Sequence, residues 1–204
     1  MEQLAVDPVQ AARLPVSQFG PIRGFRVEVV EADSGCTPEG GHTAANELVS
    51  VSRLAVVVGT TCSVALEEEM NIFDDARVVL VSPSATEDHL SQAGLETFNR
   101  TAFPERFLPS TESFAAEPDN PAYQDFVAAF EAAYGRPCCE PYAVEAYDAA
   151  AILLSAVEQV AVLDEAGSLV IPRQMLATVV RETRGFPGVS GEIHFDAVGD
   201  RVLP

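Results

Sequence analysis

The sequence predicts an α/β fold, a mostly parallel, doubly wound, Rossmann-like sheet with helices on both faces. Two short apolar runs, 54–58 and 77–81, are rich in valine and end in polar turns, as expected for strands buried on both faces of a parallel sheet. A helical pattern over 63–75 lies between them, with the three glutamates 67–69 as its expected solvated face. Strand, helix and strand in this order favour a right-handed parallel crossover.

The first hundred residues contain further strand and helix signals. Residues 2–14 predict a helix that Pro15 closes, because the residue before a proline disfavours the helical conformation. Residues 24–30 alternate between apolar and polar side chains, which predicts a strand. We expect a helix over 42–51 and another strand over 95–101.

The second half of the chain is predicted to be mainly helical. Several prolines mark an irregular connection after residue 103, within which 106–109 predicts a short strand. Residues 121–134 predict an amphipathic helix that ends at Gly135, because aromatic and apolar side chains recur on one stripe. Two more helices and a strand are expected over 141–162, 172–184 and 191–195.

Composition limits the partners that this chain can have. Its 204 residues suffice for one domain or two small ones. The 31 acidic residues exceed the 12 basic ones and give a net charge of −19. This charge repels nucleic acid and anionic membranes, so neither is an expected partner. No apolar run approaches the ~20 residues that span a bilayer, and the first residues contain no signal-peptide pattern.

Polar turns follow both central strands. The first strand leads into G-T-T-C-S at 59–63 and the second into S-P-S-A-T at 82–86. In open α/β sheets, ligands bind in a crevice at the carboxyl ends of neighbouring strands. Hydroxyl groups, backbone N–H groups and the positive end of a helix dipole would meet there and suit a carboxylate. Neither turn contains a charged side chain, which favours recognition of a zwitterion over catalysis.

Several short motifs occur in an order that resembles a known family. They are the two turns above, D-S-G-C-T-P-E-G-G at 33–41, F-N-R-T at 98–101, E-A-Y-D-A-A at 145–150 and G-V-S-G-E-I-H-F-D-A-V-G-D-R at 188–201. Together they resemble the solute-binding proteins of branched-chain amino-acid ABC transporters, in the periplasmic binding protein type I family. The resemblance implies a periplasmic or extracellular protein that binds a small amino acid or related carboxylate and works with transporter membrane components.

The resemblance also implies which residues contact the ligand. Ser63 would donate its hydroxyl and N–H groups to the ligand carboxylate, although a serine here also suits a helix cap. Thr86 and the backbone of Ser84 match positions that take the α-ammonium and carboxylate groups, although turn chemistry explains them as well. Thr61 and Cys62 are weaker candidates. In the family, an acid from a second lobe helps to hold the ammonium, and that contact cannot be carried over to this chain.

The four cysteines fall into two pairs. By resemblance, Cys36 and Cys62 form a disulfide, which is typical of an oxidising compartment, and two unconnected thiols are the alternative. The adjacent Cys138 and Cys139 leave three possibilities open: free thiols, a vicinal disulfide or a link to another chain. Their spacing does not indicate a zinc site. We expect neither a metal nor another cofactor.

Two parts of the family pattern have no counterpart in the sequence. Most of the second lobe is expected to be absent, because the segment soon after Thr101 resembles the region where the family's chain returns to its first lobe. The family's first strand has no counterpart either. We therefore expect one α/β lobe over 1–204, built from 1–102 and 103–204. Loss of a central strand leaves two inner edges unpaired, so we expect a homo-oligomer in which a partner chain fills the gap.

Three functions follow, in order of preference. The first is ligand binding without chemistry, and the alternative is an interaction or oligomerisation module that has lost its ligand. The third is a hydrolase with Ser63 as nucleophile and His89 as the least improbable base. The turn G-T-T-C-S-V lacks the second glycine of a nucleophile elbow, and the three histidines lie in separate segments. An enzyme is therefore not expected.

Overall fold

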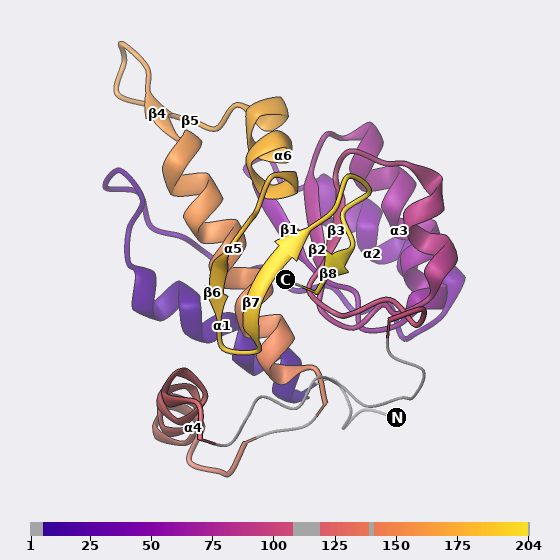
Figure 1. The fold of residues 1–204 in the computed structure, drawn as a ribbon. Helices are drawn as coiled ribbons and strands as arrows, with labels where there is room; N and C mark the ends of the chain where they lie inside the picture. Colours follow the sequence, from indigo (N-terminus) through magenta and orange to yellow (C-terminus); the bar gives the residue numbers. More distant parts are fainter. Residues whose placement is uncertain (1–5, 108–118, 139–140, 204) are drawn as a thin grey trace.

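A computed structural model describes residues 6–107, 119–138 and 141–203 of the chain (Figure 1). Its centre is a three-stranded sheet in the order β1–β2–β3. The strands are β1 (Val56–Val58), β2 (Val79–Ser82) and β3 (Phe98–Arg100). Both strand pairs are parallel, and Leu80 is in register with Val57 on one side and Phe98 on the other. The predicted parallel α/β fold is confirmed.

Helices cover both faces of this sheet. The described helices are α1 (Val6–Phe19), α2 (Pro38–Val49), α3 (Ser63–Asp75), α4 (Pro121–Tyr134), α5 (Ala143–Val160), α6 (Arg173–Arg181) and the short 3₁₀ helix η1 (Asp88–Ala93). α2 and α3 pack on one face, whereas α5 and α6 pack on the other. α1 lies against α5, and α4 shares an apolar cluster with both (Figure 1). This arrangement is the doubly wound one.

Each face of the sheet has its own apolar core. Leu66 and Phe73 from α3 cluster with Leu80 on one face. On the other face, Leu153 from α5 clusters with Val81. All four residues of β2 are buried, because this central strand has a strand neighbour on each side and a core above and below.

A small antiparallel sheet joins the end of the chain to the end of β3. It consists of β6 (Phe186–Gly188), β7 (Gly191–Phe195) and β8 (Arg201–Val202). The backbone N–H of Arg100 donates to Gly199 O at 2.9 Å. The Arg100 side chain forms a fully buried ion pair with Asp200, with Nε and Oδ1 2.6 Å apart. These contacts join residues that lie a hundred positions apart in sequence.

The strand expected over 24–30 is not present, so that prediction is wrong. β1 is an edge strand, and no described segment pairs with 24–30 to form a strand ladder. Only Ile22 and Phe25 form an isolated bridge. Phe25, Val29 and Val30 are 40%, 42% and 53% exposed. The alternating pattern is therefore not sufficient, because a strand requires a hydrogen-bonded neighbour.

Two predicted helix boundaries are also wrong. α1 continues through Pro15, because Leu14 and Pro15 are buried and the packing of α1 on α5 outweighs the lost backbone hydrogen bond. α2 begins at Pro38, before the expected residue 42. Thr37 caps this helix by accepting a hydrogen bond from Gly40 N at 3.0 Å, and a proline suits the first helical turn.

Two details of the predicted elements need correction. Glu69 does not belong to the solvated face of α3, because it is only 4% exposed and lies one helical turn from the buried Leu66. The short strand expected over 106–109 is not found at Arg106 and Phe107, which lie in a turn, and residues 108 and 109 lie outside the described residues.

The hairpin of β4 (Val162–Leu163) and β5 (Leu169–Val170) was not expected and projects beyond α5 (Figure 1).

Candidate functional site

The carboxyl ends of the three parallel strands lie next to one another at one edge of the sheet. Each strand is followed by a turn: 59–63 after β1, 83–86 after β2 and 101–106 after β3. We refer to these three turns as the strand-end site. They lie where α/β proteins commonly bind ligands.

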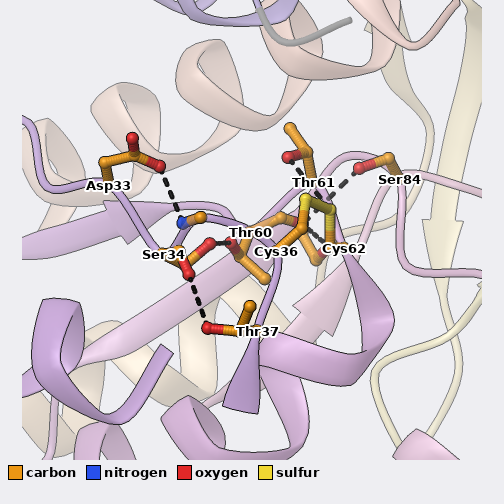
Figure 2. Close-up of a disulfide and its surroundings, with 10 residues drawn as sticks. Asp33, Ser34, Cys36, Thr37, Thr60, Thr61, Cys62 and Ser84 are labelled. Carbon is orange, nitrogen blue, oxygen red and sulfur yellow. Dashed lines mark hydrogen bonds between the residues drawn. A yellow bond between two sulfur atoms is a disulfide. The ribbon is translucent and has the colours of Figure 1, made fainter. Parts of the chain in front are cut away.

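Hydrogen bonds join the first two turns. The hydroxyl group of Ser82 donates to Thr60 O at 3.0 Å, and that of Ser84 donates to the same oxygen at 3.5 Å. Figure 2 shows Ser84 directed toward the turn that contains Thr60, Thr61 and Cys62. The hydroxyl of Thr61 lies 3.8 Å from Cys62 Sγ. The predicted contacts Ser84, Thr61 and Cys62 therefore lie together in the fold.

The first turn of α3 has no side-chain cap. Its N-cap residue is Cys62, which makes no capping hydrogen bond, and Ser63 is the first helical residue. The alternative role of Ser63 as the cap is therefore wrong. The first turn also contains no acidic residue. The N–H groups of Ala65 and Leu66 already donate to Cys62 O at 3.1 Å. An anion at this helix start would therefore meet the N–H groups of Ser63 and Val64 and the positive end of the helix dipole.

A disulfide fixes the turn after β1 to the loop before α2. It joins Cys36 and Cys62, whose Cα atoms are 5.4 Å apart, as the resemblance implied. Figure 2 shows this bond beside a contact of 3.4 Å between the hydroxyl oxygens of Ser34 and Thr60. The position of the α3 start is therefore set by a covalent bond as well as by the sheet. Cys138 is also disulfide-bonded, and residue 139 lies outside the described residues.

Thr86 contacts an acidic residue of the third turn. Its hydroxyl donates to Glu105 Oε1 at 3.4 Å, and the backbone N–H of Glu105 donates to Thr86 O at 2.9 Å. Thr86 is half-buried, and Glu105 is exposed. The strand-end site therefore contains a carboxylate, although the two turns considered in the sequence contain none.

Two buried carboxyl groups lie close to the site. Glu69, on α3, interacts with the Thr60 side chain, and burial raises its pKa to about 7. Glu145 is in the first turn of α5, and burial raises its pKa to about 7 as well. The pKa of the half-buried Tyr142 is raised by burial first and then by the negative charges of Glu145 and Glu105. Glu145 and Glu105 therefore both lie close enough to Tyr142 to raise its pKa.

The residues suggested for a hydrolase do not form a catalytic arrangement in the part of the chain that the structure describes. His89 Nε2 lies 2.7 Å from Glu67 Oε1, and His89 Nδ1 lies 3.7 Å from Glu87 Oε2. No hydrogen bond joins His89 to Ser63 among the described residues. Within the same residues, no group of three or more potential ligands is placed to hold a metal ion, and no helix has the length and apolar character to cross a membrane.

Residues 73–202, more than half of the chain, match the family described as "Periplasmic binding protein". The chain belongs to this family. The matched region begins in α3 and includes β2, β3 and the C-terminal antiparallel sheet, so it covers most of the elements that build the strand-end site.

Curated relatives of this periplasmic binding protein are named for the amino acids they bind. The leucine-specific-binding protein of Salmonella typhimurium is 32% identical over 87 residues, which are 43% of this chain and 23% of the relative. The Leu/Ile/Val-binding protein of Escherichia coli K12 is 28% identical over 86 residues, which are 42% of this chain and 23% of the relative. The match thus spans about a quarter of the length of these relatives.

Solved structures of transporter substrate-binding proteins have the same fold. LivJ of Streptococcus pneumoniae, a branched-chain amino acid transporter substrate-binding protein in complex with isoleucine, has a TM-score of 0.81 and 16% identity, with 98% of this chain and 90% of that chain covered. An ABC transporter substrate-binding protein of Desulfitobacterium hafniense in complex with leucine has a TM-score of 0.77 and 18% identity, with 96% and 90% covered. At these identities the likeness supports the fold.

Thr60, Ser82 and Glu105 belong to the site but were not among the residues predicted from the sequence. Thr60 and Ser82 occur in the two motifs, and their position at strand ends was an available signal. Glu105 had no such signal, because it lies 19 residues from Thr86 in a proline-rich connection. Only the pairing of β2 with β3 brings the two residues together.

Proposed function

We propose that this periplasmic binding protein binds a small branched-chain-like amino acid or a related carboxylate at the strand-end site. The uncapped start of α3 carries the proposal, because first-turn N–H groups without an acidic neighbour suit a carboxylate. Ser63 is the proposed donor to that carboxylate. Thr86 and the backbone of Ser84 are the proposed partners of the ammonium and carboxylate groups. Thr61 and the backbone of Cys62 are weaker proposed contacts, since Cys62 Sγ is in a disulfide.

Similarity to named relatives supports this choice of ligand. The two curated relatives described above are named for binding leucine or Leu/Ile/Val. Structural neighbours include complexes with leucine and isoleucine and also one with benzoate. These ligands share a carboxylate group, and the helix start of α3 is suited to that group.

A thermal-shift screen with amino acids and small carboxylates tests the proposal. A ligand at 100 times its Kd stabilises the native state by about 2.7 kcal/mol, which corresponds to a rise in Tm of roughly 5–11 °C for a chain of this size. Ser63→Ala and Thr86→Ala should reduce the shift. Ser155→Ala, an exposed serine on α5, is the matched control and should keep it. No shift with any ligand would contradict the proposal.

We also propose that the protein works as one lobe in an oxidising, periplasmic or extracellular setting, with ABC transporter membrane components as partners. The Cys36–Cys62 disulfide supports the setting. The Arg100–Asp200 ion pair supports a single lobe, because it joins 1–102 to 103–204. Chemical unfolding should then follow one cooperative transition. Two separate transitions by fluorescence and circular dichroism would contradict a single lobe.

A second candidate function is self-association through the open edge of β1. Gly59 N donates to Val81 O at 3.2 Å, so the backbone groups of Val56 and Val58 alternate away from β2 and point to the open edge. An unpaired strand edge favours pairing with another strand. We propose that a second copy of the chain supplies this strand. Light scattering at protein concentrations from roughly 1 to 100 µM tests the idea. A folded monomer at every concentration would contradict it.

A further inference from the structure

We propose that Glu105 supplies the carboxylate that binds the α-ammonium group of the ligand, with the Thr86 hydroxyl as its neighbour. This inference rests on the proposed amino-acid function and adds a binding residue from the third turn. It would allow a single lobe to hold both charged ends of a zwitterion.

The third turn holds Glu105 in a defined position. The backbone N–H of Glu105 donates to Thr86 O at 2.9 Å, and Phe107 N donates to Pro104 O at 2.9 Å. These two bonds fix the backbone on both sides of the Glu105 side chain. The carboxylate is thus presented to the Thr86 hydroxyl at 3.4 Å by an ordered turn.

Arg106 strengthens this arrangement without neutralising Glu105. Its guanidinium Nη1 lies 3.1 Å from Asp88 Oδ1, and its Nη2 lies 2.5 Å from Asp200 Oδ2. The Asp200 side chain is fully buried, so the Arg106 guanidinium group points into the protein and anchors the third turn. Asp196 Oδ2 lies 3.9 Å from the same Nη2, so the arginine next in sequence to Glu105 is engaged by three other acids.

Glu105 has no cationic partner among the described residues. No arginine or histidine of that part of the chain forms an ion pair with it, and its one side-chain hydrogen bond there comes from the neutral Thr86 hydroxyl. A carboxylate with this environment favours a cation. The described residues around it do not form a group of three metal ligands, whereas Ca²⁺ takes six to eight oxygens. An ammonium group, which needs only a few hydrogen-bond acceptors, is the cation that fits.

The two charged features of the site have opposite signs. The start of α3 follows β1 and carries the positive end of a helix dipole. Glu105 follows β3 and carries a negative charge, and Thr86 follows β2, the strand between them. An amino acid that lies across the strand ends, with its carboxylate toward Ser63 and its ammonium toward Glu105, has both charges matched.

Binding of leucine and of 4-methylpentanoate by isothermal titration calorimetry tests this inference. The second compound has the carboxylate and side chain of leucine but no ammonium group. Glu105→Gln keeps the shape of the side chain and removes its charge, so we expect leucine binding to weaken about tenfold or more with little change for 4-methylpentanoate. Glu96→Gln is the control, because it removes an exposed charge before β3 and should leave both affinities unchanged.

The outcomes separate this inference from the proposed function. If the wild type binds leucine and Glu105→Gln binds it within twofold of the wild type, the role of Glu105 is refuted and ligand binding stands. If the wild type binds 4-methylpentanoate as tightly as leucine, the ammonium is not recognised and the inference is again refuted. If the wild type binds neither compound, both proposals fail. Because Glu105 is exposed, the variant should keep the wild-type Tm without ligand.

Discussion

Replacing Glu145 with glutamine should stabilise the protein above pH 7 and change its stability little near pH 5. Glu145 is 2% exposed, and its Oε2 atom has no hydrogen-bond partner. Burial raises its pKa from 4.5 to about 7, against smaller lowering effects that include the charge of Arg201. The folded state therefore binds this proton more tightly than the unfolded state does.

The direction of the pH dependence follows from that difference. A raised carboxyl pKa contributes stability that is fully present below about pH 4.5 and is lost as the pH rises through about 7. The difference between these two values corresponds to about 3 kcal/mol, since one pKa unit is about 1.4 kcal/mol. Glutamine resembles the protonated acid and cannot ionise, so Glu145→Gln should not lose this contribution.

The assay is urea unfolding of the wild type and of Glu145→Gln at roughly pH 5, 6, 7 and 8, which covers the range in which Glu145 titrates. The two free energies of unfolding should be similar at about pH 5 and differ by up to about 3 kcal/mol at about pH 8, with the variant more stable. Glu68→Gln is the control, because Glu68 is exposed. A difference that does not change with pH, or a variant that is less stable at about pH 8, would show that Glu145 does not bind its proton more tightly in the folded state.

The remaining predictions concern the Cys36–Cys62 disulfide and the close approach of α2 to α3. Replacing Cys36 and Cys62 together with serine should lower the free energy of unfolding by about 3 kcal/mol, because the cross-link closes a loop with a sequence separation of 26. Urea unfolding without reductant measures this, and a midpoint equal to that of the oxidised wild type would contradict it. Gly41→Ala should cost roughly 1–3 kcal/mol, because a Cβ atom there would lie 2.4 Å from Ala65 O, where α2 crosses α3. Differential scanning calorimetry beside Thr43→Ala, an exposed change on the same helix, checks this, and an unchanged Tm for Gly41→Ala would disprove the close approach.

Helices with strong local signals were predicted with little error. α3 and α4 begin and end at the expected residues, because their signals are local. The apolar spacing lies within each helix, and α4 is also flanked by the capping Asn120 and the left-handed Gly135. The strand expected over 24–30 failed for the opposite reason. Its pattern is local, but strand formation depends on a neighbour that the described residues do not provide.

The buried acids show a further limit of sequence patterns. Glu69 follows two exposed glutamates in sequence, but the helical repeat turns it toward the core. Glu145 is buried by the end of β3 and by β8, since Thr101 Oγ1 donates to Glu145 O at 2.8 Å and Arg201 lies close enough to affect its pKa. The helical period could have identified Glu69, whereas the environment of Glu145 depends on segments distant in sequence.

The parallel α/β class, the start of α3 at Ser63 and the polar turns at the strand ends could be predicted from sequence. Each of them depends on apolar periodicity or on residues adjacent in the chain. Only the folded sheet shows that Glu105 lies beside Thr86 and that residues 24–30 have no strand neighbour among the described residues. Contacts of this kind depend on which strands pair and on where the connections between them return. Glu105 lies 19 residues from Thr86 in sequence, and no periodic pattern connects the two. Its place in the site is therefore recognisable only once the strands have paired.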